Sequence, residues 1–172
     1  LAYRMQYSGR LKPFMNIFLL DYDMQKCAEA MCDKHIVKMP LEYAQILSTV
    51  CRTNGLDVGY KATHRNHPCV KWAATSRENF QYLTHLAFHV CGEYTKRYIS
   101  RHKSGELIAT QIPMADEMPL PTTGLITPFP QCMPEQYKRT DAVEAYRAYY
   151  RGEKAKFATW KNRNPPEWWN PA

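Results

Sequence analysis

Four polar side chains, spaced for one face of a helix, stand in an otherwise apolar segment of this sequence. They are His35, Lys38, Glu42 and Gln45, which we call the polar stripe, and residues at i, i+3, i+7 and i+10 fall on one side of a helix. Large apolar residues flank them on both sides (Met31, Ile36, Val37, Met39, Leu41, Ile46 and Leu47). The polar stripe is either an ordinary solvent face with a Lys38–Glu42 pair, or a cleft wall. In a cleft, low dielectric tunes a carboxylate and an imidazole for proton or electrostatic chemistry.

Histidine and cysteine side chains offer a second chemistry, metal binding. The loop His64-Arg-Asn-His67-Pro-Cys69 provides three ligands of the zinc type, and His35 could be a fourth. Because this spacing matches no common zinc motif, we expect no metal and no cofactor, with His67 bonded to the backbone or lining the cleft. The six cysteines include no C-x-x-C pair and are expected to be reduced thiols that mostly fill the core.

The chain is basic, with a formal net charge of +7 over 172 residues. Between positions 138 and 163, eight Lys and Arg residues stand against three acids, a local charge of 8 − 3 = +5. Aromatic residues stand between these basic residues and also follow them in the sequence. Such a segment suits a phosphate backbone with stacked or unstacked bases, and the alternative is a solvated basic helix face.

Length and composition predict one globular domain, residues 1–172, in which residues 1–14 would be an N-terminal extension if Met15 is the native start. Hydrophobic residues make up 45% and charged residues 23%, which are ordinary values for a folded domain. No stretch reaches the roughly 18 uncharged apolar residues of a membrane span, and no secretory signal is recognisable. We therefore expect a monomer of the cytoplasm, or of the host cell cytoplasm if the protein is viral.

The apolar periodicity predicts a mainly α fold, a compact bundle of three major helices. The first is expected from Met24 to about Val50, capped by Asp23 and kinked or broken at Pro40. A short helix at 70–75 follows. The second major helix is expected from its cap at Ser76 to about Ser100, with Phe80, Leu83, Ala87, Val90, Tyr94 and Tyr98 facing the core.

The last third of the chain is predicted to wrap around these helices. Residues 105–139 contain six prolines and should form a long extended loop without helices. Asp141 and Glu144 make a capping box that opens the third helix, expected to end at about Lys161. An aromatic C-terminal tail with Trp168 and Trp169 completes the predicted architecture.

Several short motifs resemble the phage pyrimidine-dimer DNA glycosylases of the endonuclease V type and their longer bacterial relatives. Asp33-Lys-His35 followed by Glu42 is similar to the family's first helix, where an Asp-x-His and a later carboxylate lie in the active-site cleft. Further likenesses are found in Glu42-Tyr-Ala-Gln45, Asn66-His67-Pro68, Tyr82-Leu83, Glu93-Tyr-Thr-Lys-Arg97-Tyr98, Arg151-Gly-Glu-Lys154 and Pro166-Glu-Trp168-Trp169. The likeness spans about residues 16–169, and the chain also resembles uncharacterised phage proteins of similar length.

The resemblance implies a DNA N-glycosylase, with or without AP-lyase activity, that turns a damaged or modified base out of double-stranded DNA. Glu42 would stabilise positive charge on the sugar or shuttle protons at C1′, and His35 would orient or contact the sugar-phosphate. Arg151 and Lys154 would neutralise phosphates, while Trp168 or Trp169 would pack near the minor groove or the lesion. The remaining residues expected at the DNA surface are Gln45, His67, Arg97 and Arg147.

The nucleophile departs from the family pattern, which uses the α-amine exposed by removal of the initiator Met. Here fourteen residues precede Met15, and Met15 leads into Asn16, a bulky residue that resists Met removal. Lys38 would replace the α-amine if burial lowers its pKa, and otherwise Glu42 would activate water. Two other functions stay open: a non-catalytic DNA-binding or virion-associated phage protein, and a metal-dependent hydrolase using His35, His64 and His67.

Overall fold

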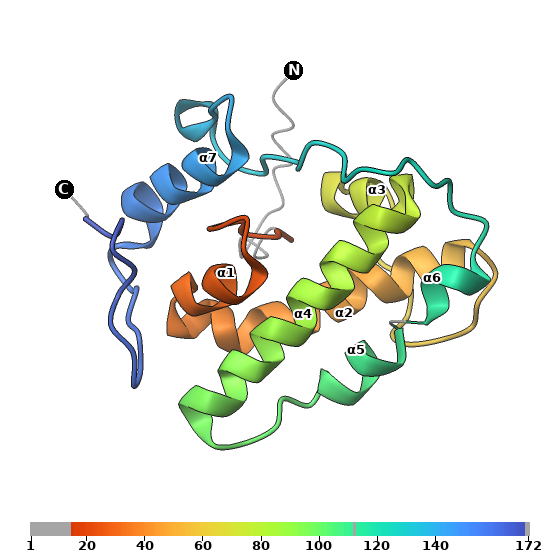
Figure 1. The fold of residues 1–172 in the computed structure, drawn as a ribbon, viewed down its shortest axis with the longest axis horizontal. Helices are drawn as coiled ribbons and strands as arrows, with labels where there is room; N and C mark the ends of the chain where they lie inside the picture. The colour runs from red at the N-terminus through yellow and green to blue at the C-terminus, as the bar shows by residue number, and fades with distance from the viewer. Residues whose placement is uncertain (1–14, 112, 171–172) are drawn as a thin grey trace, which may run out of the picture.

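The computed structural model describes residues 15–111 and 113–170, so the predicted extension, residues 1–14, lies outside the described residues. The described residues form a mainly α fold and contain no β-strand. Two long helices, α2 (Asp33–Thr53) and α4 (Arg77–Tyr98), pack against each other at its centre (Figure 1). The shorter elements are α1 (Met24–Ala30), α3 (Pro68–Thr75), α5 (Gly105–Gln111), α6 (Met114–Glu117), α7 (Ala142–Tyr149), the 3-10 turn η1 (Glu135–Tyr137) and the π turn η2 (Tyr150–Lys154). None of the described helices is long and apolar enough to cross a membrane.

The first helical stretch breaks at Met31–Cys32. Asp23 caps α1 as predicted, because its carboxylate accepts a hydrogen bond from the Lys26 amide at 2.8 Å. Met31 and Cys32 are fully buried with extended backbones, so packing rather than a Gly or Pro redirects the chain. Of the kink or break predicted at Pro40, the break does not occur: α2 continues through this residue, since buried side chains on both sides offset a cost of about 3 kcal/mol.

The second long helix is confirmed, with its predicted cap. The Ser76 hydroxyl accepts from the Asn79 amide at 3.1 Å, and α4 ends at Ile99, whose backbone is left-handed with φ of 51°. The predicted core face is buried, with Phe80, Leu83, Ala87 and Val90 fully buried and Tyr94 and Tyr98 partly buried against the core. The short helix before it, α3, is also confirmed.

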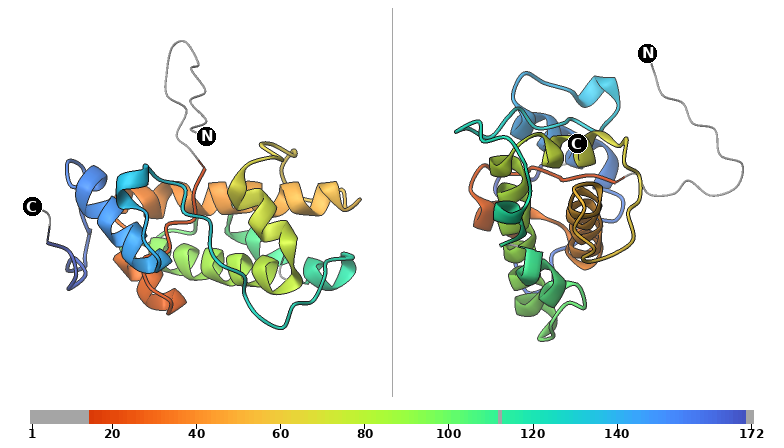
Figure 2. Two further views of the ribbon diagram at one scale, coloured as in Figure 1. Left: turned by 90° about the horizontal axis from the view of Figure 1, so that it is seen from above. Right: turned by 90° about the vertical axis from the view of Figure 1, so that its right-hand side faces the viewer.

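Residues 105–139 are only partly extended. Two short helices, α5 and α6, occupy the first part and pack on α4, so the expectation of a loop without helices is wrong. Pro113 stands at the start of α6, where a missing amide proton costs nothing. Residues 118–134 do run extended across the helices toward α7, as predicted (Figure 2). Trp72 fastens them by donating from its indole to the Thr127 carbonyl at 3.1 Å.

The third helix begins where predicted and ends early. Asp141 accepts from the Glu144 amide at 2.9 Å, but α7 stops at Tyr149 and passes into η2, well before Lys161. Gly152 lies within η2, where a Cβ would overlap the ring of Tyr137, which packs against this backbone.

The aromatic C-terminal tail folds back onto the start of α2. The Lys161 amide donates to the Asp33 carboxylate at 2.9 Å, and the Trp160 indole donates to the Ala30 carbonyl at 3.0 Å. Trp168 and Trp169 lie partly buried against the core. The tail therefore packs against the N-terminal end of α2, the end that carries His35.

Candidate active site

The polar stripe is partly covered rather than open to solvent. Lys38 Nζ lies 3.1 Å from Glu42 Oε1, with side-chain exposures of 29% and 12%. His35, at the start of α2, is buried, and Gln45 is half-buried. Three ionisable groups therefore share a region of reduced solvation, which a solvent face would not provide.

Glu42 is the carboxylate of the polar stripe, and one of its two oxygens is unsatisfied in the described structure. Its Oε2 is buried and has no hydrogen-bond partner within the part of the chain that the structure describes. Burial raises the pKa of Glu42, although Lys38 and the backbone amide of Asn16 act in the opposite direction. A carboxyl group with a raised pKa is better suited to exchange protons with a substrate than an exposed one.

The irregular segment 15–20, in which Phe18 has a left-handed backbone with φ of 57°, is buried beside Glu42. The side chain of Asn16 anchors this segment: its Oδ1 accepts from the Tyr146 hydroxyl at 2.7 Å and its Nδ2 donates to the Cys132 carbonyl at 2.8 Å. Tyr43 on α2 donates its hydroxyl to the Ile17 carbonyl. The backbone next to Glu42 is thus fixed from several elements, which holds the carboxylate's surroundings rigid.

His35 sits in an aromatic enclosure. Its ring stacks on Phe18, with centroids 4.1 Å apart, and its Nδ1 is hydrogen-bonded to the Tyr150 hydroxyl. Burial, aided by the charges of Lys38, Lys154 and Lys34, holds the pKa of His35 well below its usual value. Burial also holds the pKa of Tyr150 well above its usual range. Both groups are therefore neutral, and the bond joins His35 Nδ1 to the hydroxyl of an uncharged Tyr150.

Lys154, the last residue of η2, also lies beside the rings that enclose His35. Its Nζ lies 4.4 Å from the ring centroid of Tyr149 and 5.6 Å from that of Phe18, the ring stacked on His35. Burial and the charge of Lys38 lower the pKa of Lys154. The sequence predicted Lys154 as a phosphate contact but not its position beside the polar stripe, because 112 positions separate Glu42 from Lys154.

Arg97 occupies the core rather than the surface. It is 2% exposed and pairs with Glu93 at 2.9 Å and Asp33 at 3.0 Å. Burial works to raise the pKa of Glu93, but hydrogen bonds from Arg163 and Arg97 outweigh it and the pKa is lowered. Arg97 is committed to this ion-pair network, so we leave it out of the DNA-contacting set that the sequence predicted.

The C-terminal residues predicted to contact DNA lie close together. The guanidinium groups of Arg147 and Arg151 lie 5.3 Å and 6.0 Å from the Trp168 ring. Trp168 and Trp169 both pack edge-on against Tyr150, at 6.2 Å and 6.4 Å. Since Tyr150 also bonds His35, this basic and aromatic group is connected to the polar stripe. Arg147 is partly used internally, because it donates to the Leu20 carbonyl and pairs with Asp21.

The histidines predicted as a metal set are not brought together. His35 lies in its aromatic enclosure, whereas His64 is exposed and bonds the Thr63 hydroxyl at 2.7 Å. His67 does bond the backbone, as expected, by accepting from the Cys69 amide at 3.1 Å. Within residues 15–111 and 113–170, the side chains gathered at metal-binding distances are His67, Cys69 and Cys132. Sequence reasoning missed Cys132, which comes from a distant segment without a motif of its own.

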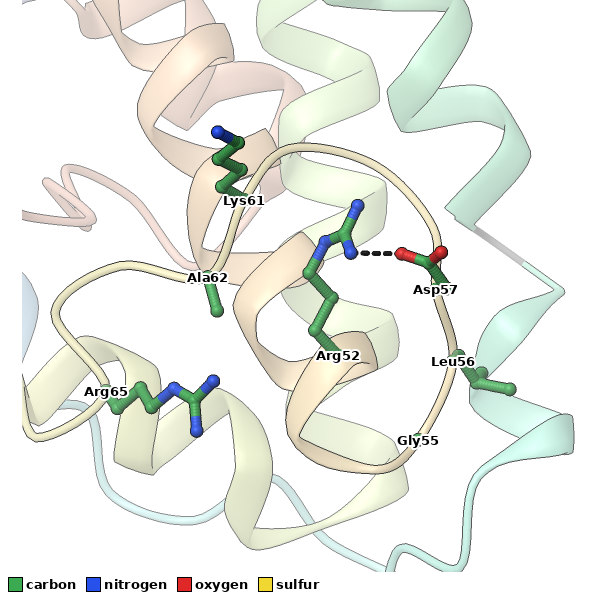
Figure 3. A pocket seen from close by; sticks show the side chains of 7 residues that line it. All are labelled: Arg52, Gly55, Leu56, Asp57, Lys61, Ala62 and Arg65. Carbon is green, nitrogen blue, oxygen red and sulfur yellow. Dashed lines mark hydrogen bonds and ion pairs between the residues drawn. The ribbon is translucent and has the colours of Figure 1, made fainter.

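An open pocket lies at the other end of α2 (Figure 3). Its lining consists of Arg52, Gly55, Leu56, Asp57, Lys61, Ala62 and Arg65. Arg52 is ion-paired with Asp57 across the loop and stands seven positions beyond Gln45 on the same helix. The pocket is therefore separate from the polar stripe.

Comparison with curated proteins and with solved structures finds no match. A protein family described as pyrimidine dimer DNA glycosylase matches residues 15–106. This range contains the whole polar stripe, and stops before the basic and aromatic group around Trp168. Because the match covers more than half of the chain, the protein belongs to the pyrimidine dimer DNA glycosylase family.

Proposed function

We propose that this protein is a DNA N-glycosylase that removes a damaged or modified base from double-stranded DNA. The observation that carries the proposal is the mostly buried Glu42 side chain, paired with Lys38 at 3.1 Å within the segment that matches the family. One of its oxygens has no partner within the described residues. A buried, incompletely satisfied carboxylate costs stability, and such costs are characteristic of groups held for chemistry.

In this proposal Glu42 acts at C1′ of a nucleotide turned out of the duplex. The glycosidic bond breaks, the base leaves with the bonding electrons and is protonated, and the carboxylate stabilises the positive charge that develops on the sugar. We propose that neutral His35 carries its proton on Nε2 and donates it to an oxygen of the sugar-phosphate. A damaged base stacks poorly, which lowers the cost of turning it out.

Two lysines could supply an amine to attack C1′. Lys38 contacts Glu42, which could take the proton that the amine must lose before it attacks. Lys154 lies beside His35, and its lowered pKa makes the free amine more available. We propose Lys38 because its proton acceptor is in contact with it. Either amine would form an imine and permit strand cleavage, whereas water activated by Glu42 would give base removal alone.

The surrounding positive charge supports binding of the DNA backbone. Lys34, Lys38 and Lys154 all lie close enough to His35 to lower its pKa, and Arg151 lies beside Trp168. We propose that these cations neutralise phosphates, and that Trp168 or Trp169 packs against the distorted duplex. The proposed groups come from one chain, and we propose that the protein acts as a monomer.

Borohydride reduction tests the reaction and identifies the nucleophile. Incubation with duplex DNA carrying an abasic site, followed by reduction, should trap a covalent adduct, and peptide mapping should place it on Lys38. An adduct on Lys154 would transfer the nucleophile's role to that residue. No adduct, and no abasic product from duplexes with ultraviolet or other base damage, would leave a non-catalytic DNA-binding protein.

A further inference from the structure

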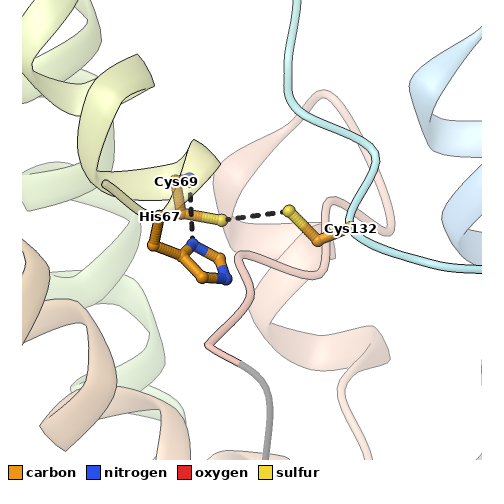
Figure 4. A group of neighbouring side chains, drawn as sticks. All are labelled: His67, Cys69 and Cys132. Atoms are coloured by element: carbon orange, nitrogen blue, oxygen red, sulfur yellow. Dashed lines mark hydrogen bonds between the residues drawn. The ribbon is translucent and has the colours of Figure 1, made fainter. Parts of the chain in front are cut away.

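We propose that His67, Cys69 and Cys132 form a binding site for one zinc-type divalent cation, with a water molecule as the fourth ligand. The ligand atoms of these three residues lie within 4.8 Å of one another. The two sulfur atoms are 3.6 Å apart, far beyond a disulfide bond of about 2.05 Å. Two thiolates on a tetrahedral zinc ion, each about 2.3 Å from the metal, stand about 3.8 Å apart, so the observed spacing is close to that of a metal-bound pair (Figure 4).

The chemistry of the donors selects the metal. One imidazole and two thiols are soft ligands, which favour zinc and similar ions over magnesium or calcium. Cys69 is buried, while His67 and Cys132 are half-buried, so an ion could enter from solvent and keep one water. The site differs from the set of His35, His64 and His67 that the sequence suggested, because it draws its third ligand from the extended connection 118–134.

Local structure already fixes each ligand. Pro68 restrains the backbone between His67 and Cys69, at the start of α3. Cys132 lies outside any helix, yet both of its backbone groups are hydrogen-bonded. Its amide donates to the Tyr146 hydroxyl at 3.3 Å, and its carbonyl accepts from the Asn16 side chain at 2.8 Å. A ligand held in place before the ion arrives loses little freedom on binding.

The imidazole of His67 is placed to bind the ion, but its Nδ1 already accepts a hydrogen bond. His67 Nδ1 accepts from the Cys69 amide at 3.1 Å, so its lone pair faces the turn that carries Cys69. A metal ion would take this lone pair in place of the amide, and both thiols would lose their protons on binding. The ion would tie α3 to the extended connection and so stabilise the wrapping of residues 118–134. Metal binding at these three residues does not require the proposed glycosylase reaction to be correct.

Cobalt binding tests the site in the full-length, reduced protein. Addition of Co²⁺ should produce thiolate-to-cobalt charge transfer and tetrahedral d–d absorption that saturate at one equivalent, and Zn²⁺ should abolish both. Cys69→Ser and Cys132→Ser should lose the charge-transfer band, and His67→Ala should weaken binding by at least about tenfold. Cys91→Ser is the matched control, because Cys91 is a half-buried free thiol elsewhere and its removal should change nothing.

A second measurement guards against variants that fail to fold. Zn²⁺ should raise the melting temperature of the wild-type and Cys91→Ser proteins, because it binds the folded state, and should leave Cys132→Ser unchanged. The proposal is overturned if the wild-type protein shows no charge-transfer band, or if the band survives in Cys132→Ser. It is also overturned if the reduced protein binds no metal and Cys69 and Cys132 instead oxidise to a disulfide in air.

Discussion

The ammonium group of Lys38 lies 3.1 Å from the carboxylate of Glu42, one turn away on α2, and the far oxygen of that carboxylate is buried without a partner in the described structure. An exposed pair of this kind contributes about 0.3–0.5 kcal/mol. Here the desolvation of Glu42 raises its pKa despite the pair, which means that burial of the charge opposes folding. The pair is therefore better explained by chemistry at Glu42 than by stability.

Glu42→Gln should separate activity from stability. The amide has almost the same shape but needs no desolvation of a charge, so the free energy of unfolding at pH 7 should stay the same or rise by up to about 1 kcal/mol. Base removal should fall by about a hundredfold or more. Denaturant unfolding and single-turnover kinetics measure the two effects, with Glu106→Gln on the exposed face of α5 as the control. A large loss of stability together with full activity would contradict this role.

The neutral, buried state of His35 predicts a loss of stability in acid. The pKa of His35 is lowered in the fold, so below about pH 6.5 the unfolded chain binds a proton that the folded chain does not. Stability should fall with decreasing pH until the folded-state pKa is reached, by at most about 1.4 kcal/mol per pH unit from this residue. In His35→Asn this part of the slope should vanish, whereas the exposed His85→Asn should keep it. Equal slopes in all three proteins, measured by urea unfolding, would refute the assignment.

Arg97 should act as a structural residue. Arg97→Met would leave the carboxylates of Asp33 and Glu93 without their shared buried partner and should lower the free energy of unfolding by about 3–5 kcal/mol. The exposed Arg101→Met should change it by less than about 0.5 kcal/mol. If Arg97→Met is as stable as the wild type and loses only DNA affinity, Arg97 belongs at the DNA surface after all.

Arg151 should contribute to DNA affinity through salt-dependent binding. Arg151→Gln should weaken binding to undamaged and damaged duplexes alike, and should reduce the slope of log affinity against log salt concentration by about 0.9. Fluorescence anisotropy at several salt concentrations measures this slope. Lys61→Gln, which changes the separate pocket at the other end of α2, should leave it unaltered. An equal effect of both substitutions would indicate non-specific attraction by the whole basic protein.

Local sequence patterns predicted the helix caps correctly, whereas contacts between distant segments could not be predicted from the sequence. The caps at Asp23, Ser76 and Asp141 follow from side chains that bond amides three residues away, and such bonds are visible as sequence patterns. The break at Met31–Cys32 has no such pattern, because it depends on burial against other elements. Lys154 reaches His35 only after α7 passes into a π turn, which periodicity does not reveal.

In the candidate site, too, local spacing could be predicted from the sequence and long-range contacts could not. The polar stripe was predicted because its four members lie on one helix and their spacing is local. The ion pair of Arg97 with Asp33 and the approach of Cys132 to Cys69 join residues more than 60 positions apart. Arg97 was predicted at the DNA surface, where arginine is usually found, and only the packed structure brings Asp33 from α2 to it.

Counting abasic sites in ultraviolet-irradiated duplex DNA, and in duplexes with other modified bases, is the decisive measurement for the proposed glycosylase reaction. The DNA is treated with the wild-type protein or Glu42→Gln and then cleaved chemically at every abasic site. We expect the wild-type protein to form abasic sites at damaged bases and, in undamaged DNA, none above background. With Glu42→Gln, abasic sites should form at least about a hundredfold more slowly. Equal rates for the two proteins, or no abasic sites in any modified duplex, would contradict the proposed reaction.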